Sequence, residues 1–262
     1  MSTPFCTYAA PSPGELTIGW EEERFLPAAL ALSLRLGLPL TPSPDHPWQL
    51  VVTDSGYRVQ ERQGRERSQV RLDLTRARPA TSIRRELLGR AVAWSDSAPP
   101  RVLDCTGGFG VDSLQLLNWG CRVHILERHP VIFALLEEAM ARAASRPDLA
   151  KTMDRASLRQ GEALTLLQGP LPFEPEVILL DPMFPPRDKT ALVSKEARLL
   201  QRLAGDGPPA EEEIQLLTLC RRLALKRVVV KRSRHGPCLG GIRPDFHIAG
   251  RSIRFDVHCT TA

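Results

Sequence analysis

An aspartate, a proline and an aromatic residue stand just after a short apolar run. Asp181, Pro182 and Phe184 follow Val177–Leu180. Proline lacks an N–H and has a fixed φ, so a strand cannot continue there, and the Asp181 carboxylate and a backbone carbonyl remain available as acceptors. Two acceptors beside an aromatic ring suit a planar amine, whose N–H bonds they would accept while Phe184 covers the ring. Asp-Pro is also common turn chemistry, so this reading needs support from the rest of the chain.

A glycine-rich turn is the second group of residues that could bind a ligand. Asp104 ends an apolar stretch and is followed by Gly107, Gly108 and Gly110 before a helical pattern begins. Glycine lets the backbone approach a ligand closely and adopt positive φ, and a helix start offers free N–H groups. Glu127 ends the next predicted strand, where an acidic side chain can accept the hydroxyls of a ribose.

NAD-binding and S-adenosylmethionine-binding folds both combine a glycine-rich turn after one strand with an acidic residue at the end of the next. The glycines here read G-G-x-G and not G-x-G-x-x-G, and Asp104 suits a cationic ligand better than a pyrophosphate. Both details favour S-adenosylmethionine as the cofactor, with Asp104, Gly108, Gly110 and Glu127 around it. Glu162 follows a third short strand and is a candidate contact on the adenine side, although an acid near a helix start is equally ordinary.

These groups can meet only if several strands end at one edge of a sheet. From residue 101 onward, strand patterns (101–104, 121–126, 158–160, 177–180 and 227–231) alternate with helical patterns (111–119, 130–144 and 211–225). Repeated units of this kind predict a doubly wound parallel sheet, and residues 246–249 and 253–258 predict an antiparallel hairpin at its end. Ligands bind beyond the carboxyl ends of such strands.

The chain before residue 81 has a different pattern. Residues 1–14 predict a flexible arm, and residues 15–80 predict a small α+β domain with a helix at 21–36, a hairpin of strands 49–53 and 57–60, and a third strand at 70–74. Residues 82–94 predict a helix that leads into a second domain, 81–262. Ten arginines against four acidic residues lie between Arg58 and Arg90, and a second basic group spans 226–234. This distribution fits contact with RNA, or simply a solvated basic surface.

Composition sets wider limits on the protein. Its 262 residues, 42% of them hydrophobic, suffice for one large or two modest domains, and a net charge of +5 favours a polyanionic partner. No apolar run approaches the roughly 20 residues that span a bilayer, and the N-terminus lacks a signal-peptide pattern, so we expect a cytoplasmic protein without a membrane partner. The scattered cysteines form no C-x-x-C pair, so we expect free thiols and no metal.

Four stretches give the chain a family resemblance. They are D-C-T-G-G-F-G-V-D-S (104–113), C-R-V-H-I-L-E-R-H-P-V (121–131), L-L-D-P-M-F-P-P-R-D-K-T-A-L-V-S-K-E-A-R (179–198) and K-R-V-V-V-K-R (226–232). The region from about residue 81 resembles the bacterial ribosomal RNA small subunit methyltransferase J family, which methylates the N2 amino group of a guanine in 16S ribosomal RNA. The resemblance implies a class I S-adenosylmethionine-dependent methyltransferase fold, which is a Rossmann-like doubly wound sheet with a C-terminal antiparallel hairpin, plus the small α+β N-terminal domain.

The resemblance also implies functional residues, position by position. Its cofactor contacts fall on Val111, Asp112, Glu127, Arg128, Glu162, Ala163 and Asp181. The family usually has a basic residue at the position of Val111 and small hydroxyl residues at those of Glu162 and Ala163, so these contacts are open between side chain and backbone.

Direct methyl transfer is the mechanism that these residues suggest. Asp181 and the Pro182 carbonyl would accept the two N–H bonds of the guanine amine, and Phe184 would stack on the base. The expected partner is 16S ribosomal RNA or the small ribosomal subunit, with contacts at Arg84, Arg85, Lys189, Lys195 and Arg198. Two alternatives stay open: an amino-group methyltransferase acting on DNA or protein, and a non-catalytic RNA-binding protein with a vestigial cofactor fold.

Overall fold

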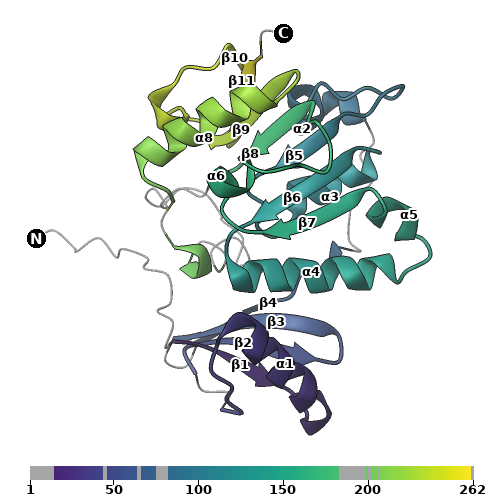
Figure 1. Ribbon diagram of the computed structural model, residues 1–262, viewed down its shortest axis with the longest axis vertical. Coiled ribbons are helices and arrows are strands. Elements are labelled where there is room, and N and C mark those ends of the chain that lie inside the picture. The colour runs from purple at the N-terminus through teal and green to yellow at the C-terminus, as the bar shows by residue number, and fades with distance from the viewer. Residues whose placement is uncertain are drawn as a thin grey trace, which may run out of the picture. The chain divides into compact units, whose positions relative to one another are not determined.

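A sheet of seven strands carries the strand ends predicted to bind the ligand (Figure 1). The computed structural model describes residues 15–43, 46–63, 66–74, 82–182, 199, 202–205 and 207–260. Neighbours in the sheet are parallel except β11, which runs antiparallel to both β9 and β10. The order is β10 (Phe246–Ala249), β11 (Ile253–Cys259), β9 (Arg227–Ser233), β8 (Val177–Leu180), β5 (Arg101–Asp104), β6 (Arg122–Glu127) and β7 (Ala156–Gln160). The predicted doubly wound sheet and its C-terminal hairpin are confirmed.

The strand order reverses at β5. The chain runs from β5 through β6 to β7 on one side and then returns to add β8 on the other side of β5. The ends of β5 and β8 therefore flank the topological switch point, where ligands bind in open α/β sheets. Strand β8 is apolar and wholly buried, and in β5 every residue except Arg101 is buried. Burial of these strands fixes Asp104, which ends β5, and Asp181, which follows β8, at the same edge.

Helices connect the strands of this sheet. Apolar residues at helical spacing bury one side of α3 (Val111–Asn118), including Leu114 and Leu117. The helix predicted at 82–94 is interrupted, because Glu86 has an extended backbone between η3 (Ile83–Arg85) and α2. The remaining helices are α2 (Leu87–Ala91), α4 (Pro130–Ala144), α5 (Ala150–Met153), α6 (Ala163–Leu166), α8 (Ala210–Leu223) and the short η4 (Leu239–Gly241).

Contacts divide the chain into two compact units. The first comprises Met1–Asp73, Pro130–Ala139 and Met183–Gly207, and the second comprises Leu74–His129, Met140–Pro182 and Pro208–Ala262. The seven-stranded sheet belongs to the second unit. The first contains a four-stranded sheet in the order β1-β2-β3-β4, with β1 parallel to β2 and the other pairs antiparallel.

The four-stranded sheet differs in part from the sequence prediction. The predicted hairpin is confirmed as β2 (Trp48–Thr53) and β3 (Gly56–Gln63), and the predicted helix as η1 (Glu23–Phe25) followed by α1 (Leu26–Leu36). The third strand predicted at 70–74 was wrong: β4 is Glu66–Val70, because Arg67 and Gln69 pair with Arg62 and Gln60. The parallel edge strand β1 (Leu16–Trp20) was not predicted.

A buried ion pair on β11 shapes the turn that follows β9. Arg254 donates two hydrogen bonds to the Asp256 carboxylate, at 2.7 and 2.9 Å, and Asp256 is only 1% exposed. The third nitrogen of Arg254 donates to the carbonyls of Ser233, Arg234 and Gly236, at 2.8 to 3.0 Å. One guanidinium thus closes the turn beyond β9.

We predict that Arg254→Met destabilises the protein strongly. Without the guanidinium the buried Asp256 carboxylate has lost its partner, and breaking a buried ion pair costs roughly 3–5 kcal/mol of unfolding free energy. Urea unfolding followed by circular dichroism measures the change. Arg251→Met, at an exposed position beside the same hairpin, is the control and should stay within about 0.5 kcal/mol of wild type. Equal stability of the two variants would contradict this role for Arg254.

Candidate active site

The glycine turn lies flat against the end of β6. The Gly107 N–H donates to the Leu126 carbonyl at 2.8 Å, and a Cβ at Gly107 would come within 2.6 Å of the Ile125 side chain. No larger residue fits there without a shift. Gly108 and Gly110 have φ of +52° and +70°, in the left-handed region that favours glycine, and Gly110 leads directly into α3. The predicted cradle at a helix start is therefore present.

Asp104 organises this turn from the inside. The residue is 3% exposed, and its carboxylate accepts hydrogen bonds from the Thr106 N–H at 3.0 Å and the Ser113 hydroxyl at 2.6 Å. Burial raises the pKa of Asp104 to about 6, against the opposing effect of the hydrogen bonds from Ser113 and Thr106. The carboxylate thus ties the turn to the first helical residues. That it also contacts a cationic ligand stays a prediction.

Glu127 lies beside the turn at the end of β6. Its two carboxylate oxygens accept hydrogen bonds from the backbone N–H groups of Gly108 and His129, both at 2.7 Å. Burial raises the pKa of Glu127, although these hydrogen bonds work in the other direction. The structure therefore fixes an acidic side chain against the glycine cradle, and that it binds ribose hydroxyls stays a prediction.

Two further predicted contacts lie beyond Glu127. Arg128 and Glu162 approach each other to 3.7 Å as an ion pair. Glu162 immediately precedes α6, whose first residue, Ala163, is buried. The ends of β6 and β7 thus bring Glu127, Arg128 and Glu162 to one edge, and that these residues contact the cofactor stays a prediction.

A lysine joins Asp181 to α3. The Asp181 N–H donates to the Thr106 hydroxyl at 2.6 Å, so the residue after β8 is tied to the glycine turn. The Lys231 ammonium lies 3.0 Å from the Asp181 carboxylate and 2.7 Å from that of Asp112. The Asp181 side chain is 42% exposed, so its carboxylate is anchored yet open to an incoming group. Two carboxylates around one ammonium leave a net negative charge, which favours a cationic ligand.

The charges in this cluster stabilise one another. Burial disfavours the charged form of Lys231, but the carboxylates of Asp181 and Asp112 outweigh it and raise the pKa of the lysine. Burial raises the pKa of Asp181, and the nearby Lys231 charge opposes that rise. Lys231 therefore stays protonated and favours Asp181 as a carboxylate, which is the form that accepts two N–H bonds.

Lys231 is the residue of this site that sequence reasoning missed. It was grouped with neighbouring basic residues as a contact for a polyanion, but all five members of that group have partners inside the fold. The signal was present in the strand order: Leu180 of β8 pairs with Val230 of β9, so residues 181 and 231 follow at the same level. The partners are Glu176 for Lys226, the Ala91 carbonyl for Arg227, Asp112 and Asp181 for Lys231, the Pro237 carbonyl for Arg232, and the Gly250 carbonyl for Arg234.

The structure describes some of the other predicted site residues and not others. Val111 is exposed at the start of α3, and Pro182 is buried after Asp181. Arg84 and Arg85 are exposed on η3, within the second unit. Phe184, Lys189, Lys195 and Arg198 lie outside the described residues. In the described ranges, no group of three or more His, Cys, Asp or Glu residues is arranged to hold a metal ion, and no helix is long and apolar enough to span a bilayer.

We predict that ionisation of Asp104 costs folding free energy. With its pKa raised to about 6 in the folded state, above its value in the unfolded chain, the group contributes stability at low pH that is lost as the pH rises from about 4 through 6. The unfolding free energy of wild type should fall by roughly 3 kcal/mol relative to Asp104→Asn between pH 3.5 and pH 7, since one pKa unit corresponds to about 1.4 kcal/mol. Urea titrations at each pH measure this difference. A constant difference would show that Asp104 ionises normally.

The site suits a ligand that carries a ribose and a positive charge, because it combines a flat glycine turn, an acid fixed against that turn and surplus negative charge. Comparisons with known proteins agree with this conclusion. The family model described as “Putative SAM-dependent methyltransferase” matches residues 32–260. The chain is 37% identical to ribosomal RNA small subunit methyltransferase J of Pseudomonas syringae pv. syringae over 93% of its length and 89% of that protein's, and 39% identical to that of Pseudomonas fluorescens strain Pf0-1 over 86% of both.

A solved structure agrees with these sequence matches. The crystal structure of the SAM-dependent methyltransferase NGO1261 from Neisseria gonorrhoeae superposes with a TM-score of 0.69 at 31% identity, covering 93% of this chain and 96% of that one. The fold is therefore the class I, Rossmann-like methyltransferase fold, and S-adenosylmethionine is the cofactor that the cradle fits. The chain belongs to the ribosomal RNA small subunit methyltransferase J family of S-adenosylmethionine-dependent methyltransferases.

Proposed function

We propose that this enzyme transfers a methyl group to the exocyclic N2 amino group of a specific guanine in 16S ribosomal RNA. One observation carries the proposal: the Asp181 side chain is 42% exposed, its carboxylate pairs with Lys231, and its backbone N–H donates to the Thr106 hydroxyl beside the glycine turn. A substrate amine bound to that carboxylate would lie next to the cofactor cradle. The names of the relatives, which are ribosomal RNA methyltransferases, support an RNA substrate.

The chemistry requires orientation more than activation. The lone pair of a guanine N2 is delocalised into the ring, so the nitrogen is a poor nucleophile and must be aligned with the methyl group. Bound S-adenosylmethionine supplies an electrophilic methyl on a sulfonium. The nitrogen–carbon bond forms as the sulfur–carbon bond breaks, and the nitrogen then loses one proton. The Asp181 carboxylate and the Pro182 carbonyl accept the two N–H bonds and stabilise the positive charge that develops on nitrogen, and Asp181 can then take the proton.

The residues around the amine have supporting roles in this proposal. Phe184 stacks on the base, a contact worth about 1–3 kcal/mol in nucleic-acid binders, and the base must be unstacked to enter. On the cofactor side, Glu127 accepts the ribose hydroxyls, while Asp104 holds the glycine turn in shape. Further contacts to the cofactor come from Gly108, Gly110, Val111, Asp112, Arg128, Glu162 and Ala163.

The wider setting follows from the substrate. We infer that the partner is 16S ribosomal RNA or the small ribosomal subunit, and that the enzyme works in the cytoplasm, where ribosomal RNA is modified. In this proposal five basic residues neutralise phosphates and hold the RNA in register without reading its sequence. These contacts are Arg84, Arg85, Lys189, Lys195 and Arg198.

Asp181→Ala tests the chemistry directly. With labelled S-adenosylmethionine and unmodified small-subunit RNA, the variant should lose at least about a hundredfold in kcat, because the acceptor of the developing charge is gone. Its affinity for the RNA should stay within about twofold of wild type. Digestion of the wild-type product to nucleosides should give N2-methylguanosine. Asp148→Ala, at an exposed position in the same unit, is the control.

Three outcomes would contradict the proposal. Retained turnover in Asp181→Ala would remove the assigned role of this carboxylate. Labelling of DNA or protein in place of RNA would change the substrate class. Tight RNA binding without methyl incorporation into any RNA fraction would indicate a binding protein with a vestigial cofactor fold.

We also predict a shift in the pH profile of Lys231→Met. Removing the ammonium leaves the Asp181 and Asp112 carboxylates without the charge between them, so the pKa of Asp181 rises further. Because transfer needs the Asp181 carboxylate, the acid limb of the kcat profile should move to higher pH. Lys226→Met, which removes a lysine paired with Glu176, is the matched control and should leave that limb in place. An unshifted profile in Lys231→Met would contradict the coupling.

A further inference from the structure

The sequence R-x-Q-x-R occurs twice in the arginine-rich stretch of the first unit. It spans residues 58–62 as R-V-Q-E-R and residues 67–71 as R-S-Q-V-R. In a strand, alternate side chains point to the same face, so each copy places its two arginines and its glutamine on one side. The methyltransferase site described above uses neither copy.

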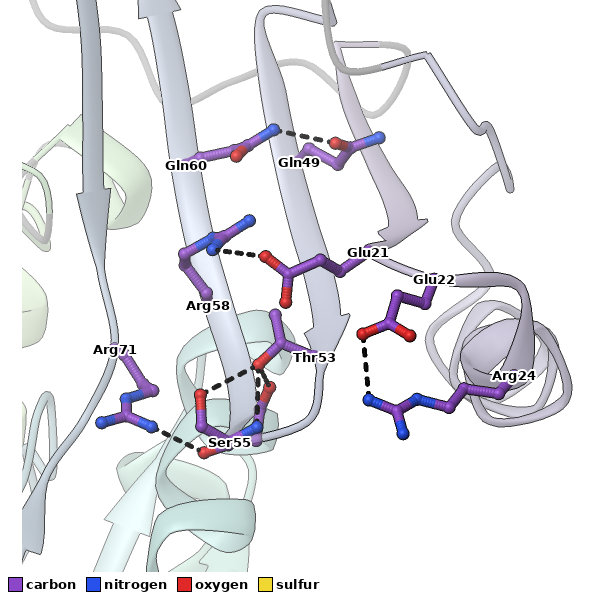
Figure 2. A network of polar contacts seen from close by, with 10 residues as sticks. Glu21, Glu22, Arg24, Gln49, Thr53, Ser55, Arg58, Gln60 and Arg71 are labelled. Atoms are coloured by element: carbon purple, nitrogen blue, oxygen red, sulfur yellow. Dashed lines mark hydrogen bonds and ion pairs between the residues drawn. The ribbon is translucent and has the colours of Figure 1, made fainter.

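The two copies lie side by side and in register. Strands β3 and β4 are antiparallel, with Gln60 opposite Gln69 and Arg62 opposite Arg67. Residues directly opposite each other share a face, so both glutamines and this arginine pair belong to one surface. Arg58 and Arg71 complete the two rows, and Arg71, just beyond β4, donates to the Ser55 carbonyl at 3.0 Å (Figure 2). We call Arg58, Gln60, Arg62, Arg67, Gln69 and Arg71 the arginine grid.

The opposite face of the same strands is a core face. Val59 and Val70, which alternate with the grid positions, are buried. Glu61 on that face is also buried, and its carboxylate lies 2.5 Å from the Arg202 guanidinium within the first unit. The arginines are therefore not scattered around the strands. They collect on the face opposite Val59, Glu61 and Val70.

The grid is basic and partly open to solvent. Arg67, Gln69 and Arg71 are exposed, and Arg58 and Gln60 are half-buried. The six positions hold four arginines and two glutamines and no acidic residue. Arg58 pairs with Glu21 at 3.3 Å, and Gln60 donates to Gln49 at 2.9 Å, which orders the side chains next to β2 (Figure 2). Arg62 is half-buried too, so the positions most open to solvent are those of β4 and of Arg71 just beyond it.

We propose that the arginine grid is an RNA-binding surface that holds the substrate through its phosphate backbone. This rests on the proposed function, which supplies an RNA substrate. Guanidinium groups bind phosphate oxygens through two parallel hydrogen bonds, and glutamine amides bind phosphate, ribose or base edges. Neighbouring strands stand about 4.8 Å apart and alternate residues about 7 Å apart, so the six positions form a regular array on one face.

The chemistry of the grid favours RNA over other anionic partners. A membrane-binding surface places apolar or aromatic side chains among its basic residues, and no grid position holds one. Evenly spaced guanidinium groups match the regular spacing of phosphates along a nucleic-acid backbone. Contacts of this kind add affinity without sequence specificity, which leaves the choice of base to the active site.

Arg62→Gln combined with Arg67→Gln tests the surface. The pair removes two charges at directly opposed positions and keeps polar side chains of similar length. The matched control, Arg146→Gln combined with Arg222→Gln, removes two exposed charges from the second unit. The probe is a protein-free transcript of small-subunit ribosomal RNA, with binding measured at several potassium chloride concentrations. Thermal unfolding verifies that each variant folds, and Arg67→Gln alone, at an exposed strand position, serves if the double variant does not.

The salt dependence is the decisive readout. Each phosphate contact on single-stranded RNA contributes about 0.7 to the slope of log affinity against log salt, so the double variant should lose about 1.4 from that slope and bind roughly tenfold more weakly at low salt. The single variant should lose about 0.7 from the slope, half of the loss in the double variant. In methyl transfer, the KM for RNA should rise. The kcat at saturating RNA and the affinity for S-adenosylmethionine should both stay unchanged. The control pair should bind as wild type does.

Several results would overturn the inference. An unchanged slope in a folded grid variant would show that the grid does not contact phosphates, and methylation by wild type would then leave the proposed function standing. An equal loss in the control pair would reduce the effect to overall charge. Binding of vesicles of phosphatidylserine and phosphatidylcholine that depends on the grid, with RNA binding unaffected, would assign the surface to a membrane. Grid-dependent RNA binding without methylation by wild type would instead defeat the proposed function while supporting the surface.

Discussion

The ammonium of Lys231 lets two carboxylates stand together at the edge of the sheet. Asp112 opens α3 beyond the glycine turn and Asp181 follows β8, and like charges so placed would repel without the lysine between them. The hydrogen bond from the Asp181 N–H to Thr106 adds a second tie between the same two segments. The start of α3 and the end of β8 are thereby fixed to each other by contacts within the chain.

The strand order explains why these contacts form. The reversal at β5 brings the ends of β5 and β8 together, and the parallel pairing of β8 with β9 adds Lys231 at the level of Asp181. Burial of apolar strands supplies the rigidity, and Arg254 closes the turn beyond β9. The proposed chemistry thus sits on strand ends whose positions are set by the core, as the orientation of a weak nucleophile would require.

The sequence predicted those features of the site whose signals lie within a few neighbouring residues. The glycines at 107, 108 and 110 and the strand-ending acids at 104, 127 and 181 carry their signals within a few residues, and the structure gathers them at one edge. Lys231 was misread because its partners lie 50 and more residues away and are brought close only by the order of the strands. Strand β4 was predicted a few residues too far along the chain. Its alternating arginine and glutamine look like an ordinary polar segment until the strand is paired with β3.

A crystal structure of the enzyme with S-adenosylhomocysteine bound would test the central claim most directly. The account predicts that the ribose hydroxyls meet Glu127, that the homocysteine part crosses the turn at Gly108, and that the sulfur faces the Asp181 carboxylate across the space of one amino group. A ligand whose sulfur points away from Asp181, or an Asp181 side chain turned into the protein interior, would contradict it.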